Sequence, residues 1–230
     1  MREILLVLSI LFGIEMVCAQ NVSDLPANSF PFNLSGNTIQ TFDNRYEGIQ
    51  GHHTFFEDFS PGLVELKNKE IYQNVLINYD AILDNLIAKS ERTSSNMVVR
   101  KGLVQRFVLY KGNEEFRFIK HSINGLPVFL LELVDGEIAF YCKVTKSIKR
   151  AELGGAYNTS QNRYDEFKSS YVYYVKDLKG LREIPQTKKG VIRSFPNLET
   201  KLNTFFKQNR IDFNDYSQGR FLFKYISENL

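Results

Sequence analysis

Short runs that alternate apolar and polar residues, each closed by a turn signal, fill the chain from residue 38 to about residue 149. Runs of this kind, rich in aromatic and β-branched side chains, are typical of strands. The turn signals lie at residues 67–70, 111–113, 124–125 and 135–136. Such short links join antiparallel neighbours, because parallel ones need a crossover of roughly a dozen residues. The pattern therefore predicts an antiparallel meander that forms a curved sheet or a partial barrel.

The run before Asp135-Gly136 is apolar at nearly every position, which distinguishes it from the other runs. Alternation places Phe129, Leu131 and Leu133 on one face and Val128, Leu130 and Val134 on the other. A strand that is apolar on both faces is covered on both sides, so we expect it inside the sheet. Asp135-Gly136 itself predicts a type I′ hairpin turn, because both residues tolerate positive φ angles.

The spacing of apolar residues changes near the C-terminus from two to that of a helix. Two short helices are predicted. The first has an apolar stripe with a proline near its start, and the second has an apolar stripe that follows two residues with the spacing of a helix N-terminal capping box. The first stripe is Leu198, Leu202, Phe205 and Phe206 after Pro196; the second is Phe221, Leu222, Tyr225 and Ile226 after Asp215 and Gln218. The predicted fold is α+β and mainly β, with two short C-terminal helices packed on the sheet.

Four segments follow from this pattern. Residues 1–19 are the predicted signal peptide described below, and residues 20–37 have no period and predict a flexible leader. Residues 38–180 form the predicted β domain, in which the polar stretch 151–169 is expected to be a long surface loop. Residues 181–230 are the predicted helical segment.

The first nineteen residues have the three parts of a secretory signal peptide. Arg2 precedes the apolar run 4–12, and Val17-Cys18-Ala19 gives a cleavage site that would leave Gln20 at the N-terminus. The apolar part is shorter than the roughly 20 residues that a membrane-spanning helix needs. We therefore expect an exported protein, periplasmic or extracellular, with no transmembrane segment after cleavage.

Charge and composition limit the classes of partner. The formal charge of +3 becomes +4 once the signal segment, with a net charge of −1, is removed, and this mild excess does not indicate nucleic acid. From residue 187 onward eight lysines and arginines face four acidic residues. That basic surface is either an ordinary solvated face, which we favour, or one that touches anionic lipid or polysaccharide. The strand-like stretch 101–108 resembles an RNA-binding motif but has Leu103 and Gln105 where that motif has aromatic residues.

Cys142 is the cysteine that remains after cleavage, so no internal disulfide is expected. Alternation places it on one face with Ile138, Phe140 and Val144. These neighbours predict a buried, inert thiol in place of a nucleophile or an intermolecular partner.

Histidines and aspartates supply the remaining candidate chemistry. His52 and His53 point to opposite faces of a strand, so one of them with His121 gives two metal ligands where zinc needs three or four. Glu57 and Asp58 are possible further ligands, although the spacing does not require them. Polar turn or strand residues are therefore the preferred interpretation of these positions, and no metal site is predicted.

Asp80 and Asp84 are four residues apart and would share a face of a helix as an acid/base pair. In a meander we instead expect them to bracket a turn, where an aspartate binds its own backbone. Nucleophile-elbow, P-loop, Cys-x-x-Cys and His-Glu-x-x-His motifs are all absent from the sequence. Asn21, Asn33 and Asn158 start glycosylation motifs, which apply only if the source is eukaryotic.

Five stretches taken together give a family resemblance that covers roughly residues 38–230. They are Tyr46-Glu47-Gly48-Ile49-Gln50-Gly51, Gly62-Leu63-Val64 to Ile71-Tyr72-Gln73-Asn74-Val75, Ile77-Asn78-Tyr79-Asp80, Phe195-Pro196 and Phe205-Phe206-Lys207-Gln208-Asn209-Arg210-Ile211. The chain resembles a broad group of exported β-rich proteins of Gram-negative bacteria, whose function is unknown. The resemblance implies a periplasmic or surface location, and it transfers no functional residues.

The first functional hypothesis is an exported, non-enzymatic β-rich protein of the cell envelope that acts as a structural or interaction module. The alternative is a periplasmic carrier of a lipid or other apolar ligand, enclosed by a curved sheet and lined by phenylalanine and tyrosine. A third hypothesis is a hydrolase whose groups meet only in three dimensions. No catalytic residue, cofactor or metal is predicted, and the expected partner is an envelope protein or an apolar ligand.

Overall fold

The computed structural model describes residues 35–39, 46–89, 96–151 and 164–230. The predicted signal peptide 1–19, the leader up to residue 34 and most of the predicted loop 151–169 lie outside the described residues. Asn21, Asn33 and Asn158 lie outside them as well.

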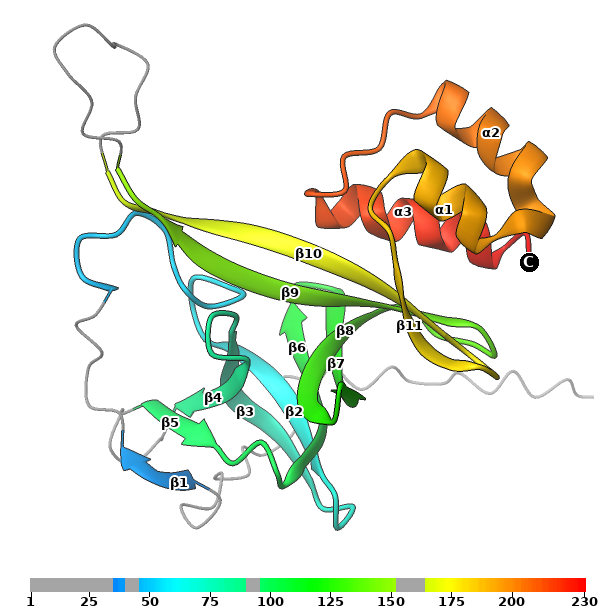
Figure 1. The fold of residues 1–230 in the computed structure, drawn as a ribbon. Coiled ribbons are helices and arrows are strands. Elements are labelled where there is room, and N and C mark those ends of the chain that lie inside the picture. Colours follow the sequence, from blue (N-terminus) through cyan, green and yellow to red (C-terminus); the bar gives the residue numbers. More distant parts are fainter. Residues whose placement is uncertain (1–34, 40–45, 90–95, 152–163) are drawn as a thin grey trace, which may run out of the picture.

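Within the described residues, one antiparallel sheet of eleven strands forms the body of the protein (Figure 1). Its strands are β1 (Ser35–Ile39), β2 (Ser60–Leu66), β3 (Ile71–Asp80), β4 (Asn85–Lys89), β5 (Asn96–Val99), β6 (Val104–Lys111), β7 (Glu114–Ile123), β8 (Leu126–Val134), β9 (Ala139–Lys149), β10 (Glu166–Asp177) and β11 (Gly180–Ile184). Their spatial order is β1-β5-β4-β3-β2-β6-β7-β8-β9-β10-β11, so the sheet is open, with β1 and β11 as its edges. This confirms the mainly β, α+β fold with a curved antiparallel sheet.

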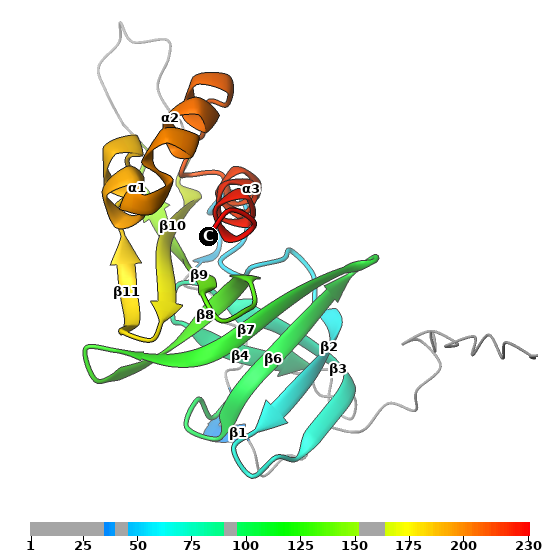
Figure 2. The same ribbon diagram turned by 90° about the vertical axis from the view of Figure 1, so that its right-hand side faces the viewer.

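Two meanders that grow in opposite directions make up this order. Strands β2 to β5 follow one another toward the β1 edge, and strands β6 to β11 follow one another toward the other edge. The chain returns from β5 to place β6 beside β2, with Val64 opposite Phe107. Figure 2 shows that the sheet curves strongly. We call the face that carries the larger cluster of buried side chains the inner face.

The type I′ turn lies at a different dipeptide from the one predicted. Asn124 and Gly125 both have positive φ angles, of 51° and 79°, and join Ile123 directly to Leu126. Gly136 has a φ angle of 151°, and the link from β8 to β9 is four residues long. The type I′ prediction for Asp135-Gly136 is therefore wrong, because an irregularity after Glu132 shifts the register of this hairpin.

Three α-helices follow the sheet, where two were expected. The segments are α1 (Lys188–Ser194), the 3-10 turn η4 (Pro196–Leu198), α2 (Glu199–Gln208) and α3 (Tyr216–Ser227). Of the predicted stripe, Leu198, Leu202 and Phe205 are buried, and Phe206 is half-buried. The extra helix α1 is capped by Thr187, whose side chain accepts a hydrogen bond from Gly190 N.

Asp215 and Gln218 both act at the start of α3, but Gln218 binds a different backbone group from the one that a capping box would use. Asp215 Oδ1 accepts hydrogen bonds from the backbone N–H groups of Ser217 and Gln218, which satisfies two donors at the helix start. Gln218 Oε1 accepts from Asp212 N, outside the helix, where a capping box would bind the Asp215 N–H. The helix start is thus tied to the preceding turn.

Segment boundaries differ from the predicted ones at three places. β1 begins at Ser35, inside the predicted leader, and β10 begins at Glu166, inside the predicted loop. β11 runs to Ile184, inside the predicted helical segment. In each case hydrogen bonds to a neighbouring strand extend the sheet into residues that do not alternate clearly between apolar and polar side chains.

Two apolar clusters lie on the two faces of the sheet. The inner one includes Phe129, Leu131 and Leu133 of β8, and the outer one includes Val128 and Leu130. This confirms that β8 is covered on both sides, although Val134 packs with the inner cluster because of the register shift. The helices lie beside β9, β10 and β11 (Figure 1), where the Phe223 ring of α3 lies 5.2 Å from the Phe140 ring and 5.0 Å from the Tyr173 ring.

Gly219 allows α3 to approach the sheet closely. A side chain at this position would meet the Tyr173 hydroxyl and would lie 2.5 Å from Tyr173 Cζ. Tyr173 is almost fully buried and donates a hydrogen bond of 3.1 Å to the Phe213 carbonyl, so its ring is fixed. The height of α3 above β10 is therefore set by a glycine.

Within the described residues, none of the helices has the length and apolar character needed to span a membrane.

Candidate functional site

The histidines lie in different surroundings. The His53 ring lies 4.7 Å from the Tyr46 ring, on the segment before β2, whereas the His121 ring on β7 lies 4.5 Å from the Tyr141 ring on the outer face. Burial, and then the charge of Lys146, lower the pKa of His52. Among the residues that the structure describes, no three His, Cys, Asp or Glu side chains gather in a way that could hold a metal ion.

Asp80 and Asp84 bracket the β3–β4 turn, as expected. Asp80 Oδ1 accepts hydrogen bonds from Ile82 N and Leu83 N within the turn. Asp84 has a φ angle of 53° and binds groups from elsewhere in the fold. Both carboxylates therefore hold the backbone, and their hydrogen-bonding capacity serves the scaffold.

Asp84 joins three separate strands and loops. Its Oδ1 accepts hydrogen bonds from the Tyr79 hydroxyl at 2.9 Å and from Phe129 N at 3.2 Å, and its Oδ2 pairs with Lys101 Nζ at 2.9 Å. Tyr79 is fully buried, and burial raises its pKa well above the usual value. This network connects the β3–β4 turn to β8, so it is a structural element of the sheet.

Cys142 lies in the inner core and is fully buried, which confirms the predicted burial. Burial raises the pKa of its thiol well above the usual range. The thiolate is the reactive form of cysteine, so this environment opposes nucleophilic chemistry at Cys142.

Two lysines have a lowered pKa, which the sequence did not indicate. Burial lowers the pKa of Lys146 to about 8, and its Nζ donates hydrogen bonds of 2.7 Å to the carbonyls of His52 and Thr54. Lys120 has a pKa of about 8, from burial and the nearby Lys67, and its Nζ binds the carbonyl of Val104. Lys146 ties β9 to the segment before β2, and Lys120 ties β7 to the start of β6 and to the Lys101 carbonyl before it, so hydrogen bonds to the backbone occupy both amines.

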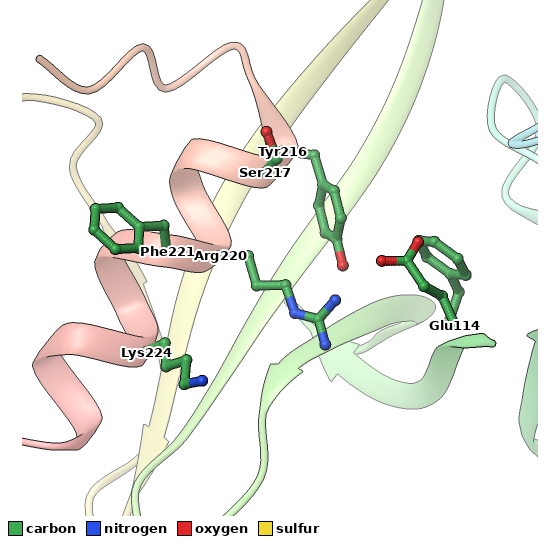
Figure 3. Close-up of a pocket in the computed structure, with 7 residues that line it drawn as sticks. Glu114, Tyr216, Ser217, Arg220, Phe221 and Lys224 are labelled. Atoms are coloured by element: carbon green, nitrogen blue, oxygen red, sulfur yellow. The ribbon is translucent and has the colours of Figure 1, made fainter.

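A groove of about 450 Å³ lies between α3 and the start of β7. We call it the α3 groove and define it by the residues that line it: Glu114, Phe116, Tyr216, Ser217, Arg220, Phe221 and Lys224. Figure 3 shows that the Arg220 side chain extends from α3 toward the Tyr216 hydroxyl and the Glu114 carboxylate. Lys224 lies one turn further along the helix.

The walls of the groove follow from the helical period and from a β-turn. Tyr216, Arg220 and Lys224 are spaced by four residues, so they form one stripe of α3 beside the stripe that packs on the sheet. Glu114 begins β7 directly after the tight turn at Gly112, which places it at the end of a hairpin. Phe116 is buried, and its ring lies 6.2 Å from the Tyr216 ring.

The electrostatics of the groove are those of a weakly positive, solvent-facing surface. Arg220 and Lys224 contribute two positive charges and Glu114 one negative charge. Burial raises the pKa of Tyr216, and the neighbouring Arg220 opposes that shift. Lys224 lies 4.0 Å from Glu228, and a pair this exposed contributes little binding energy. The charged end of Lys224 therefore remains available to a ligand, whereas Arg220 already shares a side-chain hydrogen bond with Tyr216 inside the groove.

A second hollow of about 440 Å³ is lined by Arg210, Ile211, Asp212 and Gln218. The Asp212 N–H and Gln218 Oε1 already bind each other there. Fewer of its polar groups are available to a ligand than in the α3 groove.

Sequence patterns did not locate the α3 groove. Phe221 was predicted to belong to the buried stripe of its helix, but 52% of it is exposed, and Phe223 occupies the core in its place. The signal that could have found the groove is the spacing of Tyr216, Arg220 and Lys224, which the prediction treated as a solvated face.

No protein family, curated protein or solved structure matches this chain.

Proposed function

We propose that this protein is an exported, non-enzymatic interaction module of the cell envelope, which binds its partner in the α3 groove. The observation that carries the proposal is a contrast between two sets of polar groups. The lowered-pKa lysines and the aspartates of the β3–β4 turn are bound to the scaffold. In the groove, by contrast, Lys224 extends into solvent, and Arg220 is exposed and shares a hydrogen bond with the Tyr216 side chain of the groove itself. Export rests on the three-part pattern of residues 1–19.

Binding without chemistry is supported by what surrounds each ionisable group. A catalytic site needs a nucleophile or base within hydrogen-bonding reach of a reacting atom. Lys146 is instead hydrogen-bonded to two carbonyls, Asp80 to two backbone N–H groups, and Cys142 is enclosed in the core. The groove has a different character, because aromatic rings and long flexible cations are typical of recognition surfaces.

The alternative, a carrier that encloses an apolar ligand, has less support. Such a carrier buries most of its ligand in an apolar cavity. At the centre of the inner cluster, Phe107 stacks on Phe118 with ring centroids 4.8 Å apart and meets the edge of Phe129 at 5.0 Å. These three side chains are fully buried and fill the space that an enclosed ligand would occupy.

Two measurements test the proposal. Cell fractionation with intact-mass analysis is expected to recover a chain that begins at Gln20 from the envelope or the medium. A cytosolic protein that retains Met1 refutes export.

Co-sedimentation of the mature protein with purified cell envelope then tests the groove. We expect Arg220→Gln to lower the bound fraction and Arg193→Gln, a change at an exposed cation of α1 outside the groove, to leave it unchanged. Equal binding by wild type and Arg220→Gln refutes the groove as the binding surface.

A further inference from the structure

The outward side of α3 carries an exposed aromatic ring and two exposed cations. Phe221 is 52% exposed, and Arg220 and Lys224 are exposed as well. Figure 3 shows that Phe221 and Arg220 extend to opposite sides of the helix surface. The helical period places Lys224 between them, about 60° around the helix from Phe221. A small ligand therefore cannot reach both flanks, whereas a flat surface that lies along the helix can contact all three side chains.

Helix α2 extends this surface on the Phe221 side. The Phe205 ring of α2 lies 5.4 Å from the Phe221 ring and 4.5 Å from the Tyr225 ring. Lys201 is exposed one turn before Phe205, so it adds a third cation on this side. Figure 1 shows that both helices belong to the layer that lies beyond β9 and β10. We call the exposed side chains of this surface the α2–α3 face: Lys201, Arg220, Phe221 and Lys224.

The charge of the α2–α3 face is positive. Lys224 lies 4.0 Å from Glu228, which shares the outward side of the helix, and Glu114 lies across the groove on the hairpin. The hydrogen bond that Arg220 shares inside the groove is with an uncharged hydroxyl, so its positive charge is not neutralised. Three cations and Glu228 leave a net charge of +2 along the two helices. A partner with many negative charges complements this face.

The exposed phenylalanine decides between the kinds of anionic partner. A phenylalanine ring has no hydrogen-bonding group, so it gains only from contact with apolar surface. The boundary between the headgroups and acyl chains of a bilayer offers such surface directly beside anionic groups. Lysine and arginine can lay their apolar stems along that boundary while their charged ends reach the headgroups. A lipid surface therefore satisfies both the ring and the cations of the face.

We propose that the α2–α3 face binds the surface of an anionic lipid membrane, with Phe221 inserted among the lipids and the three cations on their phosphate groups. This inference rests on the proposed function, because it names the partner that the interaction module recognises. The α3 groove opens on the same face, since Arg220, Phe221 and Lys224 also line it. Its volume of about 450 Å³ is that of a small-ligand site, so the groove can accept one lipid headgroup.

Co-sedimentation with lipid vesicles tests the inference on the mature protein. Vesicles of phosphatidylcholine alone are the neutral control for vesicles of phosphatidylcholine and phosphatidylglycerol in equal parts. We expect at least about fivefold tighter binding to the anionic vesicles, because each cation near such a surface contributes about that factor. Lys224→Gln should weaken binding to the anionic vesicles about fivefold and leave binding to the neutral ones within about twofold. Arg193→Gln, at an exposed cation of α1 outside the face, should leave both within about twofold.

Phe221→Ser separates the apolar contact from the charge. Loss of the ring should weaken binding to both kinds of vesicle at least about fivefold, so that the ratio between them stays the same. Leu178→Ser is the matched control and should bind as wild type does, because Leu178 is 96% exposed on the β10–β11 hairpin, outside the face. Phe221→Leu keeps an apolar side chain and should bind more tightly than Phe221→Ser. Phe221 and Lys224 are exposed, so these variants should unfold at the wild-type urea concentration.

Four results would overturn the inference: no binding to the anionic vesicles, equal binding to the two kinds of vesicle, equal weakening by Lys224→Gln and Arg193→Gln, or tighter binding to soluble polygalacturonic acid than to the anionic vesicles. If the vesicles do not bind but Arg220→Gln still lowers co-sedimentation with envelope, the lipid partner is wrong and the proposed function stands. If the vesicles bind but the protein is cytosolic, the proposed location is wrong and the assignment of the α2–α3 face stands.

Discussion

Replacing Gly219 with alanine tests the close approach of α3 to the sheet. In an ordinary helix this substitution stabilises by about 1 kcal/mol, because glycine loses more backbone freedom on folding. Here the added methyl group would meet the hydroxyl of Tyr173. Tyr173 cannot easily give way, since Phe213 and Phe223 contact its ring and its hydroxyl binds the Phe213 carbonyl.

The expected cost follows from these contacts. One extra methyl group in a closely packed interior destabilises by about 1–3 kcal/mol. Loss of the Tyr173 hydrogen bond adds about 1 kcal/mol. After the gain in helix propensity is subtracted, Gly219→Ala should lower the free energy of unfolding by about 2 kcal/mol. For a chain of this size that corresponds to a fall in Tm of about 4–8 °C.

Urea unfolding of a double-mutant cycle provides the assay. Tyr173→Phe removes the hydroxyl that the new methyl group would meet, so the double variant should cost at least about 0.5 kcal/mol less than the sum of the single variants. Gly102→Ala is the control, because a Cβ there meets no atom within 4 Å, and stability should change by less than about 1 kcal/mol. A Gly219→Ala variant that is as stable as wild type, or more stable, refutes the described approach of α3 to Tyr173.

Three further outcomes follow from the scaffold. Asp84→Ala should destabilise by about 2 kcal/mol in urea unfolding, because the Tyr79 hydroxyl and Phe129 N lose a shared acceptor, whereas Asp84→Asn keeps an oxygen there and should cost less than half as much. Cys142, whose thiol pKa is raised by burial, should resist iodoacetamide at pH 8 until the protein unfolds, and rapid labelling of native protein contradicts this. Lys146 has its pKa lowered from 10.5 to about 8, so the unfolded chain binds the proton more strongly. Wild type should therefore gain stability relative to Lys146→Met as the pH rises from 8 to 10.5, and a constant difference contradicts the lowered pKa.

Hairpins were the most predictable part of the fold, because their signals are local. The Asn124-Gly125 dipeptide joins two alternating runs, and the structure makes it a tight turn between β7 and β8. The pairing of β2 with β6 was not predictable in the same way. These strands are separated in the sequence by three others, so no local pattern reports their contact, which depends on how the whole sheet closes around its core.

Turn type was less predictable than turn position. Asn124-Gly125 and Asp135-Gly136 have the same sequence signature, yet only the former has positive φ angles at both residues. The register shift after Glu132 distinguishes them, since it leaves a longer link between β8 and β9. That shift depends on the packing of Val134 against the inner core, which is a tertiary effect.

The two faces of α3 explain why the fold was easier to predict than the groove. The period of apolar residues predicts which stripe of a helix packs on a sheet, but the prediction placed Phe221 in that stripe. Phe223, two residues further on and on nearly the opposite side of the helix, is the one that is buried. Gly219 faces Tyr173 of β10, so the side of α3 that carries Gly219 and Phe223 is the one that meets the sheet. The same contact positions Arg220, one residue further on, relative to Glu114 across the groove. Stability and ligand binding are therefore coupled at one point. A folded Gly219→Ala variant should co-sediment with purified cell envelope less than wild type although its groove side chains are unchanged, and an unaltered bound fraction would show that the groove does not depend on this contact.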